Sequence, residues 1–175
     1  MRLTYITTSL ALLATMPFSV HAGKAHTHGE GTVEVVMEVA KGKGNLSIRL
    51  ELPLDVVIGF ERAPRTEKEK ADLAAAEKLL ADTTLFTPAE AAQCSAQPVA
   101  LSMPRFEAKS GKGQADHADV DVTYSYTCAA PAALKSINTA VFKHFKRLYR
   151  LEARRVGPDG QGAARLTPKQ PALIW

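Results

Sequence analysis

Three stretches in which apolar and polar residues alternate constrain the fold of this chain more than any other feature. They cover residues 26–39, 46–52 and 117–128, and only Val36 interrupts the alternation. Successive side chains of an extended chain point to opposite faces, so each stretch predicts a strand with one buried face and one polar face. The buried positions expected from this pattern are Val33, Val35, Met37, Val39, Leu46, Ile48, Leu50, Leu52, Val120, Val122, Tyr124, Tyr126 and Cys128.

The segments between and after these strands predict the rest of the architecture. Residues 41–45 are rich in glycine and asparagine, so the first two strands should form an antiparallel hairpin. Thr66 and Glu69 have capping-box spacing and predict a helix to about residue 82, and Thr87 begins the same pattern before a short helix ending at Cys94. Further strands are expected near residue 100, over 137–142 and over 149–156. The fold class predicted is α+β: one domain with an antiparallel sheet, one longer helix and several short ones.

The first 22 residues have the properties of an export signal. Arg2 precedes an apolar run centred on residues 10–14, and Val20 and Ala22 are the small residues expected at positions −3 and −1 of a cleavage site. The run is shorter than the roughly 20 residues of a membrane-spanning helix, although an uncleaved anchor is the alternative. We therefore expect a signal peptide over 1–22, a mature domain over 23–175 in the periplasm, and no membrane insertion after cleavage.

Cys94 and Cys128 are the two cysteines of the chain. An even pair in an exported protein favours a disulfide over a metal or catalytic site, because the compartment is oxidising. Closing a loop of this length would stabilise the domain by about 3 kcal/mol or somewhat more in the chain-entropy model.

The charge of the chain argues against a nucleic-acid partner. Removing Arg2 with the signal lowers the net charge from +4 to +3. The densest basic stretch, residues 143–155, fits either a patch for an anionic partner or a solvated face. We favour the solvated face and expect no nucleic acid, since an exported protein meets little of it.

Histidines and carboxylates at the starts of two predicted strands form the candidate functional site. The first row is His26, His28 and Glu30, and the second is His117, Asp119 and Asp121. Residues two apart in a strand share a face, so the two rows converge if the strand beginnings lie side by side. Imidazole nitrogens and carboxylate oxygens are zinc ligands. The alternative is a solvated histidine tail beside an ordinary polar strand face.

Five short motifs follow one another along the chain. They are His26-Thr27-His28-Gly29, Gly-Phe-Glu-Arg-Ala-Pro over 59–64, His117-Ala118-Asp119 leading to 124–128, Pro-Ala-Ala-Leu over 131–134, and Leu166-Thr167-Pro168. In this order the set resembles the ZrgA-like family of exported, histidine-rich zinc-binding proteins. The resemblance spans nearly the whole mature chain.

The resemblance implies that the protein binds zinc in the periplasm, captures it, and supports its uptake or its delivery to a zinc ABC transporter or that transporter's binding protein. Carried over by motif, the ligands are His26, His28, His117 and Asp119. The chain departs from the family pattern in two places. Residues 109–114 contain no histidine where members carry a histidine-rich insertion, and Arg62 stands where histidine is common. One zinc site is therefore expected rather than several.

Two other functions and a second metal are open at this point. A zinc-dependent hydrolase would use Asp121 or Glu30 as general base, but the chain has no His-Glu-x-x-His motif and no nucleophile elbow. We therefore expect a protein that is not an enzyme. A structural periplasmic domain with incidental histidines is the other alternative. Copper(II) is a possible second metal, because it binds such nitrogen and oxygen donors more tightly than zinc.

Overall fold

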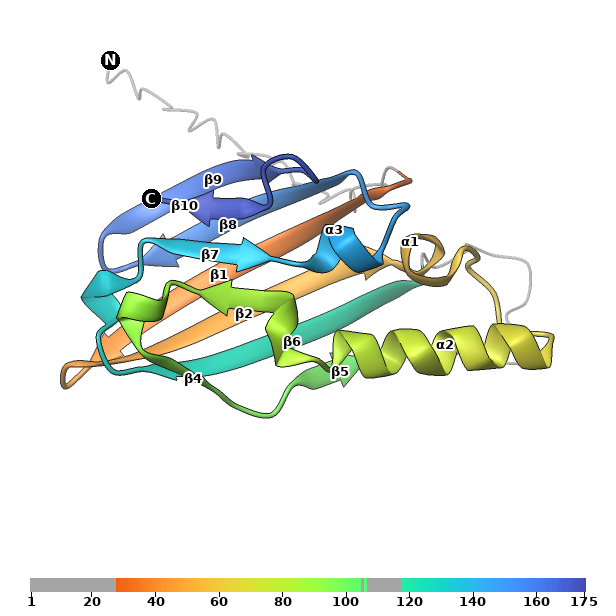
Figure 1. The fold of residues 1–175 in the computed structure, drawn as a ribbon, viewed down its shortest axis with the longest axis horizontal. Coiled ribbons are helices and arrows are strands. Elements are labelled where there is room, and N and C mark those ends of the chain that lie inside the picture. The colour runs from red at the N-terminus through yellow and green to blue at the C-terminus, as the bar shows by residue number, and fades with distance from the viewer. Residues whose placement is uncertain (1–27, 105, 107–117) are drawn as a thin grey trace, which may run out of the picture.

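The computed structural model describes residues 28–104, 106 and 118–175. The expected signal peptide and the 109–114 loop lie outside these residues. Figure 1 shows the order of the elements. The strands are β1 (Glu30–Ala40), β2 (Lys43–Pro53), β3 (Phe86–Pro88), β4 (Cys94–Ala96), β5 (Ala100–Ser102), β6 (Asp119–Cys128), β7 (Ser136–Thr139), β8 (Arg150–Gly157), β9 (Gly160–Leu166) and β10 (Ala172–Ile174). The helices are α1 (Leu54–Ile58), α2 (Glu67–Leu80) and α3 (Val141–His144), with short 3₁₀ turns η1 (Thr83–Leu85), η2 (Glu90–Ala92) and η3 (Pro131–Ala133).

A large sheet with strand order β4-β6-β2-β1-β8-β9 forms one layer, and β5 also pairs with β6. The three alternating stretches form its centre: β1 and β2 are the predicted hairpin, and β6 pairs antiparallel with β2. The expectation of an antiparallel sheet is wrong for one pair, since β1 and β8 run parallel. Between β1 and β8 the chain passes through the second layer, and β8 then joins the large sheet in the same direction as β1. The sheet is therefore mixed.

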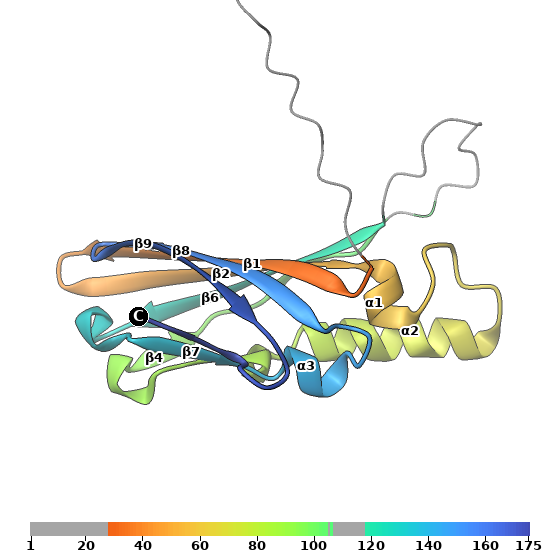
Figure 2. The same cartoon turned by 90° about the horizontal axis from the view of Figure 1, so that it is seen from above.

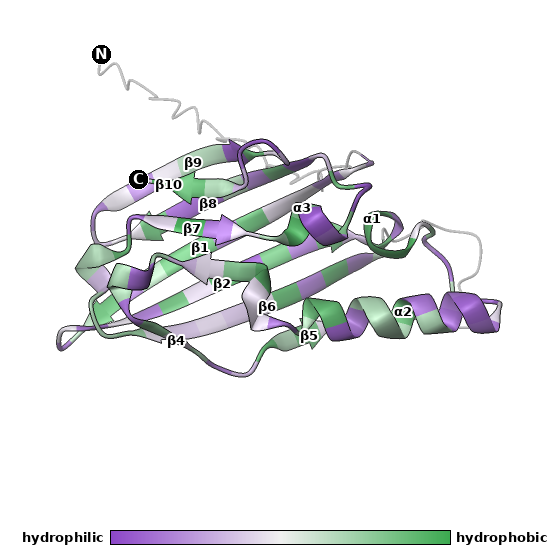
Figure 3. Ribbon diagram, viewed as in Figure 1, coloured by the Kyte–Doolittle hydropathy of each residue, from purple (hydrophilic) through white to green (hydrophobic). Residues whose placement is uncertain are grey.

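The core lies between this sheet and a second layer, as the view in Figure 2 shows. Ile48, Leu50, Leu52, Val120 and Tyr124 are fully buried on the inner face. Figure 3 shows the resulting bands of apolar and polar residues across β1, β2 and β6. The predicted inner positions are confirmed except at the end of β1, where Val39 is exposed.

The second layer consists of a small sheet, β10-β7-β3, together with α2 and α3. The capping box of α2 is confirmed: Thr66 Oγ1 accepts a hydrogen bond from Glu69 N at 3.1 Å, and the Glu69 carboxylate accepts from Thr66 N. The second capping prediction is wrong. Thr87 lies in β3 opposite Asn138, and pairing with β7 extends the chain where a helix was expected.

The predicted disulfide is present. Cys94 and Cys128 stand directly opposite each other on β4 and β6, with an S–S distance of 2.05 Å, so the bridge fastens an edge strand to the central part of the sheet. Among the described residues, no helix is long and apolar enough to cross a membrane.

Candidate metal site

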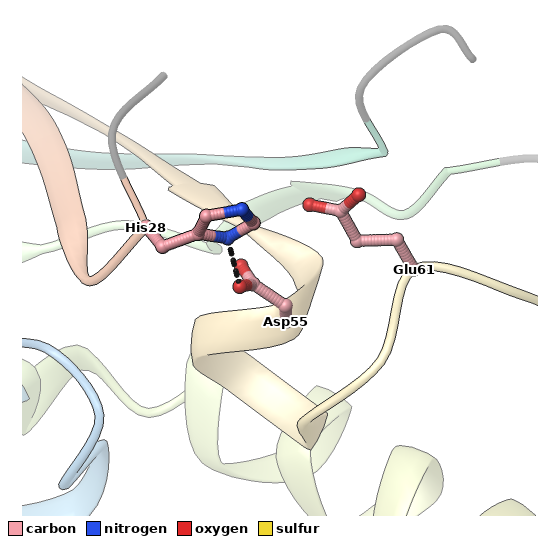
Figure 4. Close-up of side chains that lie close together, drawn as sticks. All are labelled: His28, Asp55 and Glu61. Atoms are coloured by element: carbon pink, nitrogen blue, oxygen red, sulfur yellow. Dashed lines mark hydrogen bonds and ion pairs between the residues drawn. The ribbon is translucent and has the colours of Figure 1, made fainter.

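Three side chains with metal-ligand chemistry lie together at one end of the large sheet (Figure 4). His28 lies two residues before the start of β1, Asp55 lies in the first turn of α1, and Glu61 lies in the segment that follows α1. One ligand atom from each side chain lies within 4.8 Å of those of the other two. The cluster therefore offers one imidazole nitrogen and two carboxylate oxygens to a single ion.

The antiparallel hairpin explains why residues so distant in sequence meet. The start of β1 lies beside the end of β2, because Thr32 pairs with Glu51 near the two ends. Pro53 ends β2, and the buried Leu54 fixes the beginning of α1 directly afterwards. Asp55 is therefore held beside the residue that leads into β1.

Two glycines shape the backbone around the cluster. Gly29 has φ +83°, and a Cβ there would lie 2.6 Å from the Tyr149 ring, so the chain turns sharply between His28 and β1. Gly59 has φ +91° and ends α1, where its N–H donates to the Asp55 carbonyl. This left-handed residue turns the chain after α1 and leads it to Glu61.

A short hydrogen bond links the imidazole to the aspartate. His28 Nδ1 lies 2.7 Å from Asp55 Oδ2, and Figure 4 shows the Glu61 carboxylate turned toward the same ring. The hydrogen bond to Asp55 and the negative charge of that carboxylate raise the pKa of His28 above 6.5, and Glu61 adds to the shift. The other oxygen of Asp55, Oδ1, is buried and has no hydrogen-bond partner within the described ranges.

The donor set fits zinc. Zinc binds nitrogen at about 2.0–2.1 Å and carboxylate oxygen at about 2.0–2.2 Å, usually with four ligands, so three protein donors leave one position for another group. Burial of Asp55 Oδ1 without a hydrogen bond is costly, and a cation would offset that cost. The His28 side chain is 84 % exposed and that of Asp55 is 23 % exposed, so an ion can enter from solvent without a conformational opening.

The histidines predicted from sequence are only partly covered by the structure. His28 belongs to the cluster, whereas His26 and His117 lie outside the described residues. The residue after His117 is placed: the Ala118 carbonyl accepts a hydrogen bond of 2.7 Å from Leu54 N, next to Asp55. The starts of β1 and β6 are thus at the same end of the sheet, but β2 lies between them.

The predicted carboxylates take other positions. Glu30 accepts a hydrogen bond from Tyr149 Oη at 2.6 Å and pairs with Arg150; these contacts lower its pKa. Asp121 Oδ1 accepts two hydrogen bonds from Arg49, at 2.9 and 2.6 Å. Asp119 lies opposite Pro53 at the start of β6, and the structure does not place it in the cluster.

Asp55 and Glu61 were missed by the sequence argument, which looked for ligands on the strands. Two signals point to them in retrospect. Asp55 is the one charged residue between Pro53 and Phe60, and Glu61 belongs to the Gly-Phe-Glu motif over 59–61. Neither signal indicates that Asp55 and Glu61 lie beside His28, because that proximity depends on the pairing of β1 with β2.

Comparisons with known proteins address the identity of the chain. A search of curated proteins finds no match to the sequence. The model of the ZrgA family of zinc uptake proteins matches residues 25–175, which include every described element of the fold. The chain therefore belongs to the ZrgA family of zinc uptake proteins.

Proposed function

We propose that this protein captures Zn²⁺ in the periplasm and supports its uptake by releasing it to a transport system, with His28, Asp55 and Glu61 as ligands. Family membership supports a role in zinc uptake. The observation that carries the site is the convergence of three donor atoms within 4.8 Å of one another.

Further ligands are proposed from the two histidines outside the described residues. His117 precedes Ala118, whose carbonyl accepts a hydrogen bond from Leu54 N at the start of α1. His26 is two residues before His28 in the sequence. We therefore propose either imidazole as the ligand in the fourth zinc position.

The exposure of the cluster favours capture and release over permanent storage. A structural zinc site is closed by four protein ligands, often including cysteine thiolates. Here both cysteines are held in the disulfide, and His28 is largely exposed. A transporter, or the binding protein that serves it, could therefore approach the ion directly. We propose a zinc ABC transporter as the recipient and a binding role rather than hydrolysis.

Calorimetric titration of the mature protein with Zn²⁺ at pH 7.5 tests the proposal. We expect one ion per chain, and a loss of affinity of at least about tenfold in each of the variants His28→Ala, Asp55→Ala and Glu61→Gln. His144→Ala and Glu38→Gln are matched controls, because both residues are exposed and neither belongs to the cluster. The variants His26→Ala and His117→Ala then identify the remaining donors.

Two results would contradict the assignment. If His28→Ala binds zinc as tightly as the wild type, the cluster is not the site. If the wild type binds no zinc while remaining folded, zinc capture by this chain is wrong. Copper(II) titrated in parallel is expected to bind the same variants with the same ranking, because it uses the same donors.

A further inference from the structure

A cavity of about 330 Å³ opens at the opposite end of the molecule from the metal cluster. It lies between the last residues of β1, the turn joining β8 to β9, the η3 turn and Trp175. In Figure 1 this is the end of the sheet where β8 turns into β9, away from α1. The cavity is thus separate from the proposed zinc site.

The lining is apolar and adaptable. Val35, Met37 and Leu134 form its buried part, and the flexible thioether of Met37 adjusts to differently shaped contents. Four large apolar residues of the described chain are exposed, and two of them, Val39 (45 %) and Val156 (41 %), belong to this lining. Exposed apolar surface beside a hollow is typical of a ligand site.

The charged side chains of the lining leave one net positive charge. Arg155 Nη1 lies 2.8 Å from Asp159 Oδ1, and Lys135 Nζ lies 3.6 Å from Oδ2 of the same carboxylate, so two cations share one anion. The Arg155 guanidinium also lies over the Trp175 ring, 4.8 Å from its centroid. A ligand with an apolar body and one negative charge would complement this arrangement.

We propose that this cavity binds small amphipathic monoanions, with the apolar chain among Val35, Met37 and Leu134 and the anionic head beside Lys135 and Arg155. A cavity of about 150 Å³ holds benzene, so this volume accommodates on the order of ten carbon atoms. A medium-chain carboxylate has the required size and charge.

Trp175 supplies a direct readout, because it is the one tryptophan of the chain and lines the cavity. The full mature protein is titrated with octanoate and octylammonium below their micelle concentrations and with 1-octanol below its solubility limit, and tryptophan emission and heat are recorded. We expect octanoate to produce a saturable change with one site per chain. Octanol should bind more weakly and octylammonium weakest of the three.

Two variants and a control locate the binding. Val39→Phe places a larger side chain at the mouth and should weaken octanoate binding at least about tenfold, while phenylalanine remains suited to a strand. Lys135→Glu should weaken octanoate about three- to tenfold, the range expected for an exposed charge, and leave octanol unchanged. Lys169→Glu makes the same charge change at a residue outside the lining and should have no effect. Circular dichroism confirms that each variant is folded.

Several outcomes would overturn the proposal. An absence of saturable octanoate binding by both readouts contradicts a ligand site, and octanol or octylammonium binding as tightly as octanoate contradicts the anionic class. Octanoate affinity that is unchanged in folded Val39→Phe and Lys135→Glu places the binding elsewhere. A shift of tryptophan emission with protein concentration alone would assign the cavity to a second copy of the chain.

Discussion

Replacing Gly59 by alanine tests whether the turn after α1 positions Glu61 in the proposed zinc site. Gly59 has φ +91°, and the hairpin residue Gly42, at the other end of the sheet, has a similar φ of +79°. An L-residue in this left-handed region costs about 1–2 kcal/mol. At Gly42 nothing lies within 4 Å of the new Cβ, whereas at Gly59 the Arg147 guanidinium would be 2.8 Å away. That guanidinium is the end of a flexible side chain and can move, so backbone strain dominates at both positions.

Both variants, Gly59→Ala and Gly42→Ala, should therefore lose about 1–2 kcal/mol of unfolding free energy, or about 2–8 °C in Tm for a domain of this size. Their zinc affinities should differ. Relaxation of the strain at Gly59 moves the segment that carries Glu61, so Gly59→Ala should bind zinc several-fold more weakly. The Gly42 variant should bind like the wild type. Urea unfolding and zinc calorimetry measure the two effects separately. The reasoning is refuted if both variants, equally destabilised, retain the affinity of the wild type, or if Gly42→Ala loses as much affinity as Gly59→Ala.

Three further results are expected. Zinc affinity should fall as the pH drops, and the fall should begin above pH 6.5 because Asp55 raises the pKa of His28. In titrations from pH 8 to 5.5, Asp55→Asn should move the beginning of this fall to lower pH. Tyr124→Phe should cost about 1–3 kcal/mol in urea unfolding, since its buried hydroxyl donates at 2.7 Å to the last carbonyl of α2. Reducing the disulfide, whose cysteines are 34 residues apart, should cost about 4 kcal/mol in the chain-entropy model, and a loss under 1 kcal/mol would contradict that estimate.

Much of the fold could be predicted because its determinants are local. Alternation identifies β1, β2 and β6, and the Thr66 to Glu69 spacing identifies the start of α2. The parallel pairing of β1 with β8 could not be predicted, because two amphipathic strands can pair in either direction. The direction depends on the path of the chain between the two strands. At Thr87 the local pattern is misleading. It favours a helix cap, but the residue lies in β3 because this segment pairs with β7.

The metal cluster was predictable only in part. His28 is recognisable from its spacing to His26, and the convergence of strand starts at one end of the sheet follows from antiparallel pairing. The partners of His28 are less evident, because Asp55 and Glu61 lie in a helix and the segment after it, where no periodic pattern marks them. Glu30 and Asp121 show a second limit of sequence reasoning. Their carboxylates contact Arg150 and Arg49, which lie on other strands.

The parallel pairing of β1 with β8 also affects the order in which the sheet can form. Glu30 pairs with Arg150, and these partners are 120 positions apart (150 − 30). A chain synthesised from its N-terminus can form the β1–β2 hairpin early, but a two-stranded hairpin is marginally stable by itself. The sheet is completed only after β8 has followed. Until then His28 belongs to an incomplete sheet, so binding of the proposed zinc ion and the last steps of folding should occur together.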